Sequence, residues 1–229
     1  MAGEQAHSAE EVQAELEAVL SGCRASHDVL VSTLSDLDDA AVRRPSRLDS
    51  WTVGHVMTHL ARNADSHTRM LTAACQGEAV EQYAGGREER AKNIEAGARR
   101  SAAALLDDTL RSITELEAAW VAMTPQSWDG KGLSHGRPWP CRAMPYFRWR
   151  EVEIHHVDMG TGYEPTDWPE GYVGRELQLT LATVPGRLAD AAERRRLLAW
   201  LTGRAPAPGA LDLAGWESRP GNYFSGISG

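Results

Sequence analysis

The sequence predicts a mainly α-helical protein, with a four-helix bundle in residues 1–160 and a small C-terminal domain or tail in residues 161–229. Four long segments carry apolar residues at helical spacing, and the linkers between them contain glycine, proline or polar residues. Hydrophobic residues make up 42% of the 229 positions, which is enough for an ordinary buried core. Four amphipathic helices of this length indicate a bundle in which the apolar faces are buried against one another.

The first helix is predicted to begin directly after Ser8, because Ser8 and Glu11 have the Ser-x-x-Glu spacing of a capping box. Apolar residues then recur at helical spacing from Val12 to Leu34. His27 lies on this apolar stripe, where a core histidine with a satisfied hydrogen bond is more common than a metal ligand. The sequence therefore predicts one long opening helix.

The second helix follows a polar linker that starts at Pro45. It is predicted to open near Ser50 or Thr52, because both are good N-cap residues. Its apolar face continues to about Cys75, and Gly77 is the expected stop.

The third segment keeps a helical period from Arg90 to Met123 and predicts one long helix. Residues 125–145 contain four prolines and three glycines, which is too broken a stretch for a helix. The fourth helix is predicted from residue 145 to about Met159, because proline is tolerated in a first turn and Gly160 follows at the end. The linkers are long enough for one connection between helices that are not neighbours.

The fourth helix carries ionisable residues where an apolar stripe is expected. Glu151 and His155 are four residues apart, so both side chains project from one face about one turn apart. A carboxylate and an imidazole held in this way can share a metal ion, or they can form a simple hydrogen bond on a helix surface. A metal site needs a further ligand from another part of the chain.

The second helix offers such ligands. His55 and His59 are also four residues apart, and His67 lies two turns further on. If His59 faces Glu151 and His155 across a bundle, two histidines and one carboxylate converge. That set suits a catalytic zinc with one open position, and non-haem iron and other divalent metals also use it. The alternative is that these histidines only pack, cap the helix or lie exposed.

Composition and charge exclude several classes of protein. The formal net charge is -8 and no basic run occurs, so a nucleic-acid-binding or acidic-membrane surface is not expected. No long uncharged apolar stretch occurs, so we expect neither an exported protein nor one that spans a membrane. The three separated cysteines, Cys23, Cys75 and Cys141, suit a reducing compartment better than a disulfide framework. We therefore expect a cytoplasmic protein.

Two helical segments resemble one known family. Residues 54–63 read Gly-His-Val-Met-Thr-His-Leu-Ala-Arg-Asn, and residues 148–158 read Arg-Trp-Arg-Glu-Val-Glu-Ile-His-His-Val-Asp. Together with Trp51 and the Gly-Gly-Arg of residues 85–87, they look like the mycothiol-dependent maleylpyruvate isomerase family, within the DinB-like superfamily of metal-dependent four-helix bundles. The resemblance extends over about residues 10–170.

The resemblance implies a zinc site and a catalytic arginine. In that family zinc is bound by the second histidine of an H-x-x-x-H motif and by the glutamate and first histidine of an E-x-x-x-H motif. The matching residues here are His59, Glu151 and His155. His55 then becomes a neighbour of the metal rather than a ligand. The family also has a C-terminal arginine that is important for activity, which Arg204 matches.

The C-terminal region departs from the family pattern. Such enzymes usually carry a small α/β domain with strand-like segments before the Gly-Arg, whereas residues 188–200 are predicted here to be helical. The domain therefore looks shortened, and it is either α/β or helical. Without a catalytic role, Arg204 would be a cation that favours the C-terminal end of a helix. Residues 205–229 are rich in proline and glycine, and they either pack on the bundle or remain mobile.

The implied reaction is the zinc- and mycothiol-dependent isomerisation of maleylpyruvate. An open position on zinc favours the thiolate form of mycothiol, and the thiolate adds to the cis double bond. Rotation about the new single bond and expulsion of the thiol give the trans product, fumarylpyruvate. An arginine would bind a substrate carboxylate. Arg204 is the family's candidate, and Arg62, Arg148 and Arg150 are further candidates for which surface ion pairs are the ordinary expectation.

Two other functions stay open at the level of sequence. The same zinc-bound thiolate could attack another electrophilic metabolite or toxin and stay attached to it, which would make the protein a mycothiol S-transferase. The shortened C-terminal region motivates a third alternative, a non-catalytic metal-binding helical protein. The first two share their expected partners, a small thiol and a small dicarboxylate-like electrophile.

Further ionisable residues lie close to these motifs. Asp158, one turn after His155, and Asp65 are candidates for orienting a metal-bound imidazole. His156 points about 100° away from its neighbour on the helix, so we place it outside the ligand set. Glu153 also points away from the ligand face, and we expect it to be solvated.

Overall fold

The computed structural model describes residues 8–188, 190–209, 211 and 213. These residues form two compact units, one that ends at Pro169 and one that starts at Glu170. We describe each unit by itself.

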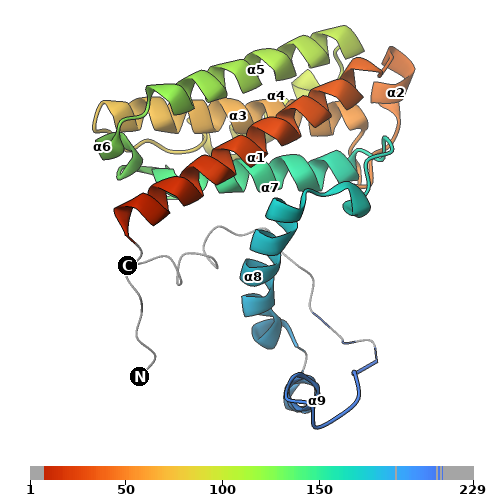
Figure 1. Ribbon diagram of the computed structural model, residues 1–229. Coiled ribbons are helices and arrows are strands. Elements are labelled where there is room, and N and C mark those ends of the chain that lie inside the picture. Colours follow the sequence, from red (N-terminus) through yellow and green to blue (C-terminus); the bar gives the residue numbers. More distant parts are fainter. Residues whose placement is uncertain (1–7, 189, 210, 212, 214–229) are drawn as a thin grey trace. The chain divides into compact units, whose positions relative to one another are not determined.

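The first unit is a bundle of four long helices, α1 (Ala9–Ser35), α3 (Val53–Cys75), α5 (Ala102–Ala122) and α7 (Met144–Asp158), which lie side by side in Figure 1. Each helix packs against two others, because α3 contacts α5 and α7, and α1 contacts the same two helices. The predicted mainly helical bundle is therefore confirmed.

Neighbouring helices run in the same direction in two of these pairs. The C-terminal ends of α3 and α5 lie together, since the sulfur of Cys75 lies 3.5 Å from the sulfur of Met123. The two helices are therefore parallel. Helices α1 and α7 are also parallel, because residue numbers rise along both helices from the contact of Ser26 with Glu153 to the contact of Thr33 with His156. Two parallel neighbours need a returning connection, and α4 (Gly86–Gly97) lies in the connection from α3 to α5.

The helix ends follow the predicted signals. Ser8 and Glu11 form the capping box: the Ser8 N–H donates to a Glu11 carboxylate oxygen at 2.7 Å, and the Glu11 N–H donates to the Ser8 hydroxyl at 3.2 Å. Thr52 is the N-cap of α3. Gly77 and Gly160 follow α3 and α7 with φ of 77° and 64°, values that favour glycine.

The third predicted helix is wrong in one respect, because the segment forms two helices rather than one. The chain leaves α4 after Gly97 and enters α5 at Ala102, where the Ser101 hydroxyl accepts the N–H of Ala104 as an N-cap. Gly97 packs closely on α3, since an added Cβ would lie 2.4 Å from Cγ2 of Thr58. The helical period continues across the break, so periodicity alone does not reveal it.

The linkers contain short elements that the sequence did not predict. A short helix, α2 (Asp39–Arg43), precedes the linker to α3. The stretch 125–145 forms no long helix, as predicted, but it is ordered as α6 (Pro125–Trp128), the antiparallel hairpin β1 (Lys131–Ser134) and β2 (Arg137–Pro140), and η1 (Cys141–Ala143). His135 and Gly136 make the hairpin turn with φ of 53° and 74°.

The core lies between the four long helices. Each fully buried leucine or methionine there stabilises the fold by about 1.5–3 kcal/mol. One cluster of buried apolar side chains comes mainly from α1, α3, α5 and α7, and it consists of Leu30, Leu34, Val42, Val53, Val56, Met57, Leu60, Ala102, Leu105, Ile113, Val152 and Met159.

The second unit is helical over its described residues. It contains α8 (Glu170–Arg187) and α9 (Ala191–Leu201), and a single antiparallel bridge joins Leu188 to Leu213. The helix predicted in residues 188–200 is present as α9. Residues 214–229, which make up most of the proline- and glycine-rich tail, lie outside the described residues. In the part of the chain that the structure describes, no helix is both long and apolar enough to cross a membrane.

Candidate metal centre

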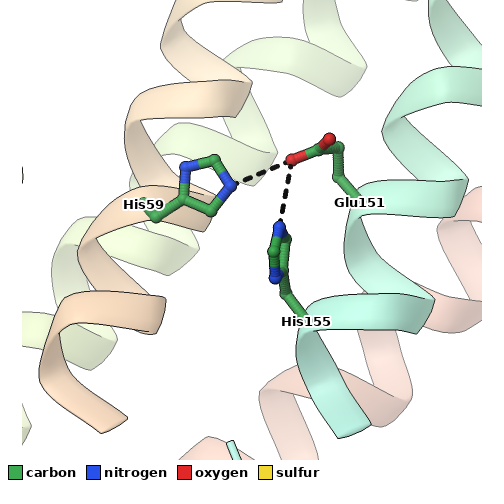
Figure 2. A group of neighbouring side chains, drawn as sticks. All are labelled: His59, Glu151 and His155. Atoms are coloured by element: carbon green, nitrogen blue, oxygen red, sulfur yellow. Dashed lines mark hydrogen bonds and ion pairs between the residues drawn. The ribbon is translucent and has the colours of Figure 1, made fainter. Parts of the chain in front are cut away.

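Three side chains from two helices meet near the solvent edge of the bundle. His59 comes from α3, while Glu151 and His155 come from α7 and project from one face of it (Figure 2). Each residue offers one donor atom, and the three atoms lie within 4.8 Å of one another. Nε2 of His59 is 2.9 Å from a Glu151 carboxylate oxygen, and Nε2 of His155 is 3.5 Å from the same oxygen.

This geometry suits a divalent metal. A tetrahedral zinc with bonds of about 2.1 Å holds its donor atoms about 3.4 Å apart, and the two separations from the Glu151 oxygen, 2.9 and 3.5 Å, lie near this value. The two imidazole rings meet edge to face at 4.6 Å between centroids, so they do not block each other. The side chain of His59 is only 5% exposed, whereas Glu151 and His155 are 23% and 19% exposed. Glu151 and His155 are therefore in partial contact with solvent, whereas His59 is buried.

The charges of the three residues also suit a cation. Burial opposes ionisation of Glu151, but hydrogen bonds from His155 and His59 hold its pKa well below the usual value. Burial lowers the pKa of His59 to about 4, against the effect of its hydrogen bond to Glu151. Burial would also lower the pKa of His155, but hydrogen bonds to Asp158 and Glu151 raise it to about 9. A bound metal would take the place of the proton that His155 otherwise holds.

The second nitrogen of His155 meets a carboxylate, as the sequence suggested. Nδ1 of His155 is 2.8 Å from a carboxylate oxygen of Asp158. This contact fixes the ring so that Nε2 faces Glu151, which is the arrangement that metal-binding histidines usually have. Asp65 has no such role, because its carboxylate pairs with Arg62 at 2.8 Å.

The second nitrogen of His59 has a different partner. An Nη atom of Arg90, on α4, lies 2.9 Å from Nδ1 of His59. The Arg90 guanidinium also lies over the ring of Tyr83, at 5.5 Å from its centroid. Trp51 packs edge to face on His59, with 5.7 Å between ring centroids. The sequence did not single out Arg90, although it lies in the helix that follows the Gly-Gly-Arg segment of the resemblance.

The other histidines of α3 and α7 lie outside the group. His55 accepts the N–H of Thr52 through Nδ1 and pairs with Glu95 through Nε2, so neither ring nitrogen faces the three clustered residues. His67 is fully buried against Trp139, and neither ring nitrogen has a hydrogen-bond partner among the described residues. His156 also points elsewhere, as predicted.

The expectation that Glu153 is solvated is wrong. Glu153 is 1% exposed, and its carboxylate accepts hydrogen bonds from the Ser26 hydroxyl, the Trp149 indole N–H at 3.0 Å and the Tyr163 hydroxyl at 2.6 Å. The face of α7 opposite the ligands is covered by α1, so pointing away from the metal does not mean pointing into water.

The expectation of surface ion pairs is wrong for two of the three arginines. Arg148 and Arg150 are 0% and 1% exposed. Arg148 donates to the Leu60 carbonyl at 2.7 Å and to the Asn63 side-chain oxygen at 2.9 Å, which ties α7 to α3 next to the ligands. Arg62 does form ion pairs, with Asp65 and with Asp108.

Arg204 belongs to the second unit. It follows α9, its side chain is exposed, its N–H donates to the Ala199 carbonyl at 2.7 Å, and its guanidinium donates to the Thr202 carbonyl. These contacts close the C-terminal end of the helix. The catalytic role of Arg204 stays a prediction.

Comparison with known protein families identifies the family of the helical bundle. Residues 23–160 match the mycothiol maleylpyruvate isomerase N-terminal domain. The chain belongs to this family. The matched range includes the three clustered residues His59, Glu151 and His155, and it ends before Arg204.

Solved structures agree with this family. A crystal structure of the mycothiol-dependent maleylpyruvate isomerase is 28% identical to this chain with a TM-score of 0.69, and the match covers 76% of this chain and 71% of that one. A structure of a histidine-to-alanine mutant of the mycothiol-dependent maleylpyruvate isomerase matches at 27% identity, with the same TM-score and coverage. No match was found among curated proteins.

Proposed function

We propose that this protein is a zinc-dependent, mycothiol-dependent isomerase that converts maleylpyruvate to fumarylpyruvate, with His59, Glu151 and His155 as the metal ligands. The observation that supports it most strongly is the convergence of these three side chains, from helices far apart in sequence, in a member of this isomerase family. Two histidines and one carboxylate leave a position open for a small molecule, as in catalytic zinc sites.

The side chains of the protein prepare the site in separate ways. Glu151 stays ionised at neutral pH and supplies the negative charge. Asp158 holds His155 in the tautomer and orientation that turn Nε2 toward the centre of the group. A bound zinc would lower the pKa of a coordinating thiol, so that the thiolate is available at neutral pH.

The reaction is balanced without a net change in the thiol. The thiolate sulfur forms a bond to one carbon of the cis double bond, and the electron pair moves into the adjacent carbonyl as an enolate. Rotation about the carbon–carbon single bond follows. The enolate pair then re-forms the double bond in the trans geometry and the thiolate leaves. Arg204 is the proposed partner of a substrate carboxylate and of the enolate charge in this scheme.

The proposal is tested with purified protein and two matched histidine variants. The wild type should bind one zinc ion and convert maleylpyruvate only when mycothiol is added, in parallel assays with mycothiol, glutathione and no thiol. His59→Ala should lose zinc and at least about 100-fold of the activity, since removing even an outer partner of a ligand costs 10–100-fold. His55→Ala, one turn earlier on α3, should keep its zinc.

Unchanged zinc content and activity in His59→Ala would refute this assignment. The products separate isomerisation from transfer. Quantitative recovery of mycothiol supports the isomerase, whereas a stable thiol conjugate in the mass spectrum would identify an S-transferase. An absence of binding to any of several low-molecular-weight thiols, measured by calorimetry on the zinc form, would leave a non-catalytic metal-binding protein.

A further inference from the structure

Arg90 makes a contact that conflicts with a metal at His59. The guanidinium of an arginine carries only N–H donors and keeps its proton in proteins. Its 2.9 Å contact therefore makes Nδ1 of His59 a hydrogen-bond acceptor. The ring proton then lies on Nε2, the atom 2.9 Å from the Glu151 carboxylate. Figure 2 shows the two ring nitrogens of His59, one directed at Glu151 and the other turned away from it.

A metal reverses these roles. The nitrogen that faces Glu151 and His155 is Nε2, so this atom must offer its lone pair to a cation held by the three residues. A neutral imidazole then carries its proton on Nδ1, and two donors would face each other at the Arg90 contact. His155 has no such conflict, because its second nitrogen already meets the Asp158 carboxylate.

Arg90 also lacks a carboxylate partner of its own. In the part of the chain that the structure describes, none of its contacts is with a carboxylate: they are with His59 and with Tyr83, whose ring and hydroxyl both meet the guanidinium. Two other arginines of the bundle, Arg62 and Arg100, differ in this respect, since both pair with Asp108 at 2.7 Å. A half-buried guanidinium without a carboxylate partner keeps donors that can bind an anion in a bidentate way.

We propose that Arg90 binds a carboxylate of the substrate, after a cation bound by His59 displaces its guanidinium from Nδ1. This inference rests on the proposed metal centre and adds a binding residue to it. A dicarboxylate substrate brings two negative charges, and Arg204 accounts for one of them at most. Arg90 lies on α4 and contacts His59 directly. Its guanidinium is therefore a second positive side chain, placed next to the three clustered residues.

The first test measures zinc binding to the metal-free protein by titration calorimetry, so it does not depend on turnover. Arg90→Gln should bind zinc as tightly as the wild type or several-fold more tightly, because no Arg90 contact has to break. Arg87→Gln is the matched control, since Arg87 lies one turn earlier on α4 and donates to His135 instead. A tenfold weaker zinc affinity in Arg90→Gln, with the helical content unchanged, would show that Arg90 only supports His59 and would overturn the inference.

The second test uses maleate, a cis dicarboxylate, as a probe on the zinc-loaded protein. Arg90→Gln should bind maleate at least about tenfold more weakly than the wild type, which is the scale of a lost charge-assisted hydrogen bond. Arg90→Lys should recover part of the loss, and Arg87→Gln should match the wild type. The monomethyl ester of maleate has only one free carboxylate. Its affinities for the wild type and for Arg90→Gln should therefore differ less than the affinities of maleate for the two proteins.

The outcomes separate the inference from the function on which it rests. Zinc binding together with equal maleate affinity in the wild type and Arg90→Gln overturns the role of Arg90 and leaves the metal centre standing. Absence of zinc binding in the wild type overturns both. In steady-state assays the proposal predicts that Arg90→Gln raises KM for maleylpyruvate by about tenfold or more, with a smaller change in kcat.

Discussion

The two faces of α7 carry the same residue types and do different things. Toward α3, Glu151 and His155 meet a second histidine, and all three groups can offer lone pairs to one point. Toward α1, Glu153 accepts hydrogen bonds from hydroxyl and indole donors. On that side His156 lies 2.9 Å from the Thr33 hydroxyl and stacks on Tyr163 at 3.8 Å.

The two faces of α7 differ in the groups that contact the glutamate and the histidine, and not in the glutamate and the histidine themselves. A hydroxyl or an indole N–H satisfies a buried carboxylate permanently, because neither group gives up its proton near neutral pH. Imidazole partners can release theirs to water when a cation binds in its place. A polar cluster inside a helical bundle is therefore a metal-site candidate when its members are histidines and carboxylates alone, and a structural network when hydroxyl and indole donors complete it.

The largest effect expected from this contrast is that of Glu151→Ala. This change removes the anionic donor from the ligand face, so zinc binding and thiol-dependent activity should fall by at least about 100-fold. Zinc content by atomic emission and turnover of maleylpyruvate measure the two losses. Glu153→Ala, on the other face, serves as the control and should retain its zinc; equal zinc loss in both variants would erase the distinction between the faces.

The next effect is that of Asp158→Asn, which sharpens the ligand side of the comparison. The amide can still accept a hydrogen bond from His155, but it no longer carries the charge that supports the imidazole. Zinc affinity should fall by about 10–100-fold, the usual cost of losing such a partner. Competition with a chelator of known affinity gives the value, and an affinity equal to wild type would show that Asp158 has no influence on the metal.

Glu153→Ala should act on stability rather than on zinc. It leaves the Trp149 and Tyr163 donors with fewer acceptors in a buried setting, which costs about 2 kcal/mol of unfolding free energy. Urea unfolding of the metal-free protein measures this loss. A variant as stable as the wild type would mean that the α1 face does not depend on its buried carboxylate.

The smallest effect concerns the pH dependence of stability in the metal-free protein, where His155 and His156 have opposite signs. Hydrogen bonds to Asp158 and Glu151 overcome burial and raise the pKa of His155 to about 9, so its stabilisation is complete below about pH 6.5 and is lost as pH rises through 9. Burial lowers the pKa of His156 to about 4, so stability is lost as pH falls from 6.5 through 4.

Glutamine variants separate these two contributions. His155→Gln should lose stability mainly below pH 8, and His156→Gln should flatten the acid limb between pH 6.5 and 4, each by about 1 kcal/mol. Urea unfolding at pH 5, 7 and 9 in the presence of a chelator measures both. Parallel curves for the two variants would contradict the assigned signs.

The sequence was sufficient for the bundle and for the ligand spacing. Helix signals such as the Ser8 capping box and Gly160 act within one turn, so they can be recognised locally. The i, i+4 spacing of Glu151 and His155 fixes a shared face in the same way. The placement of His59 opposite them needed the family resemblance, because no local rule pairs two helices that lie about 90 residues apart.

The errors have a common physical cause. Periodicity shows which residues share a face, but not how many neighbours cover the helix, and α7 is covered on more than one side. Glu153 and Arg148 were therefore expected in water and are buried. The apolar period continues through the break before α5, so the sequence pattern does not reveal where one helix ends and the next begins. Arg90 reaches His59 only through the packing of α4 on α3, which no local pattern encodes.

The returning connection between the parallel helices α3 and α5 has a consequence for protein engineering. Within α4, Ile94 is the buried side chain, so most of this segment can be rewritten without disturbing the core. The clustered residues His59, Glu151 and His155 lie on α3 and α7, which such changes would leave untouched. Libraries confined to α4 would therefore vary the surroundings of His59 while the three clustered donors stay constant, which makes this segment the natural starting point for changing what binds beside them.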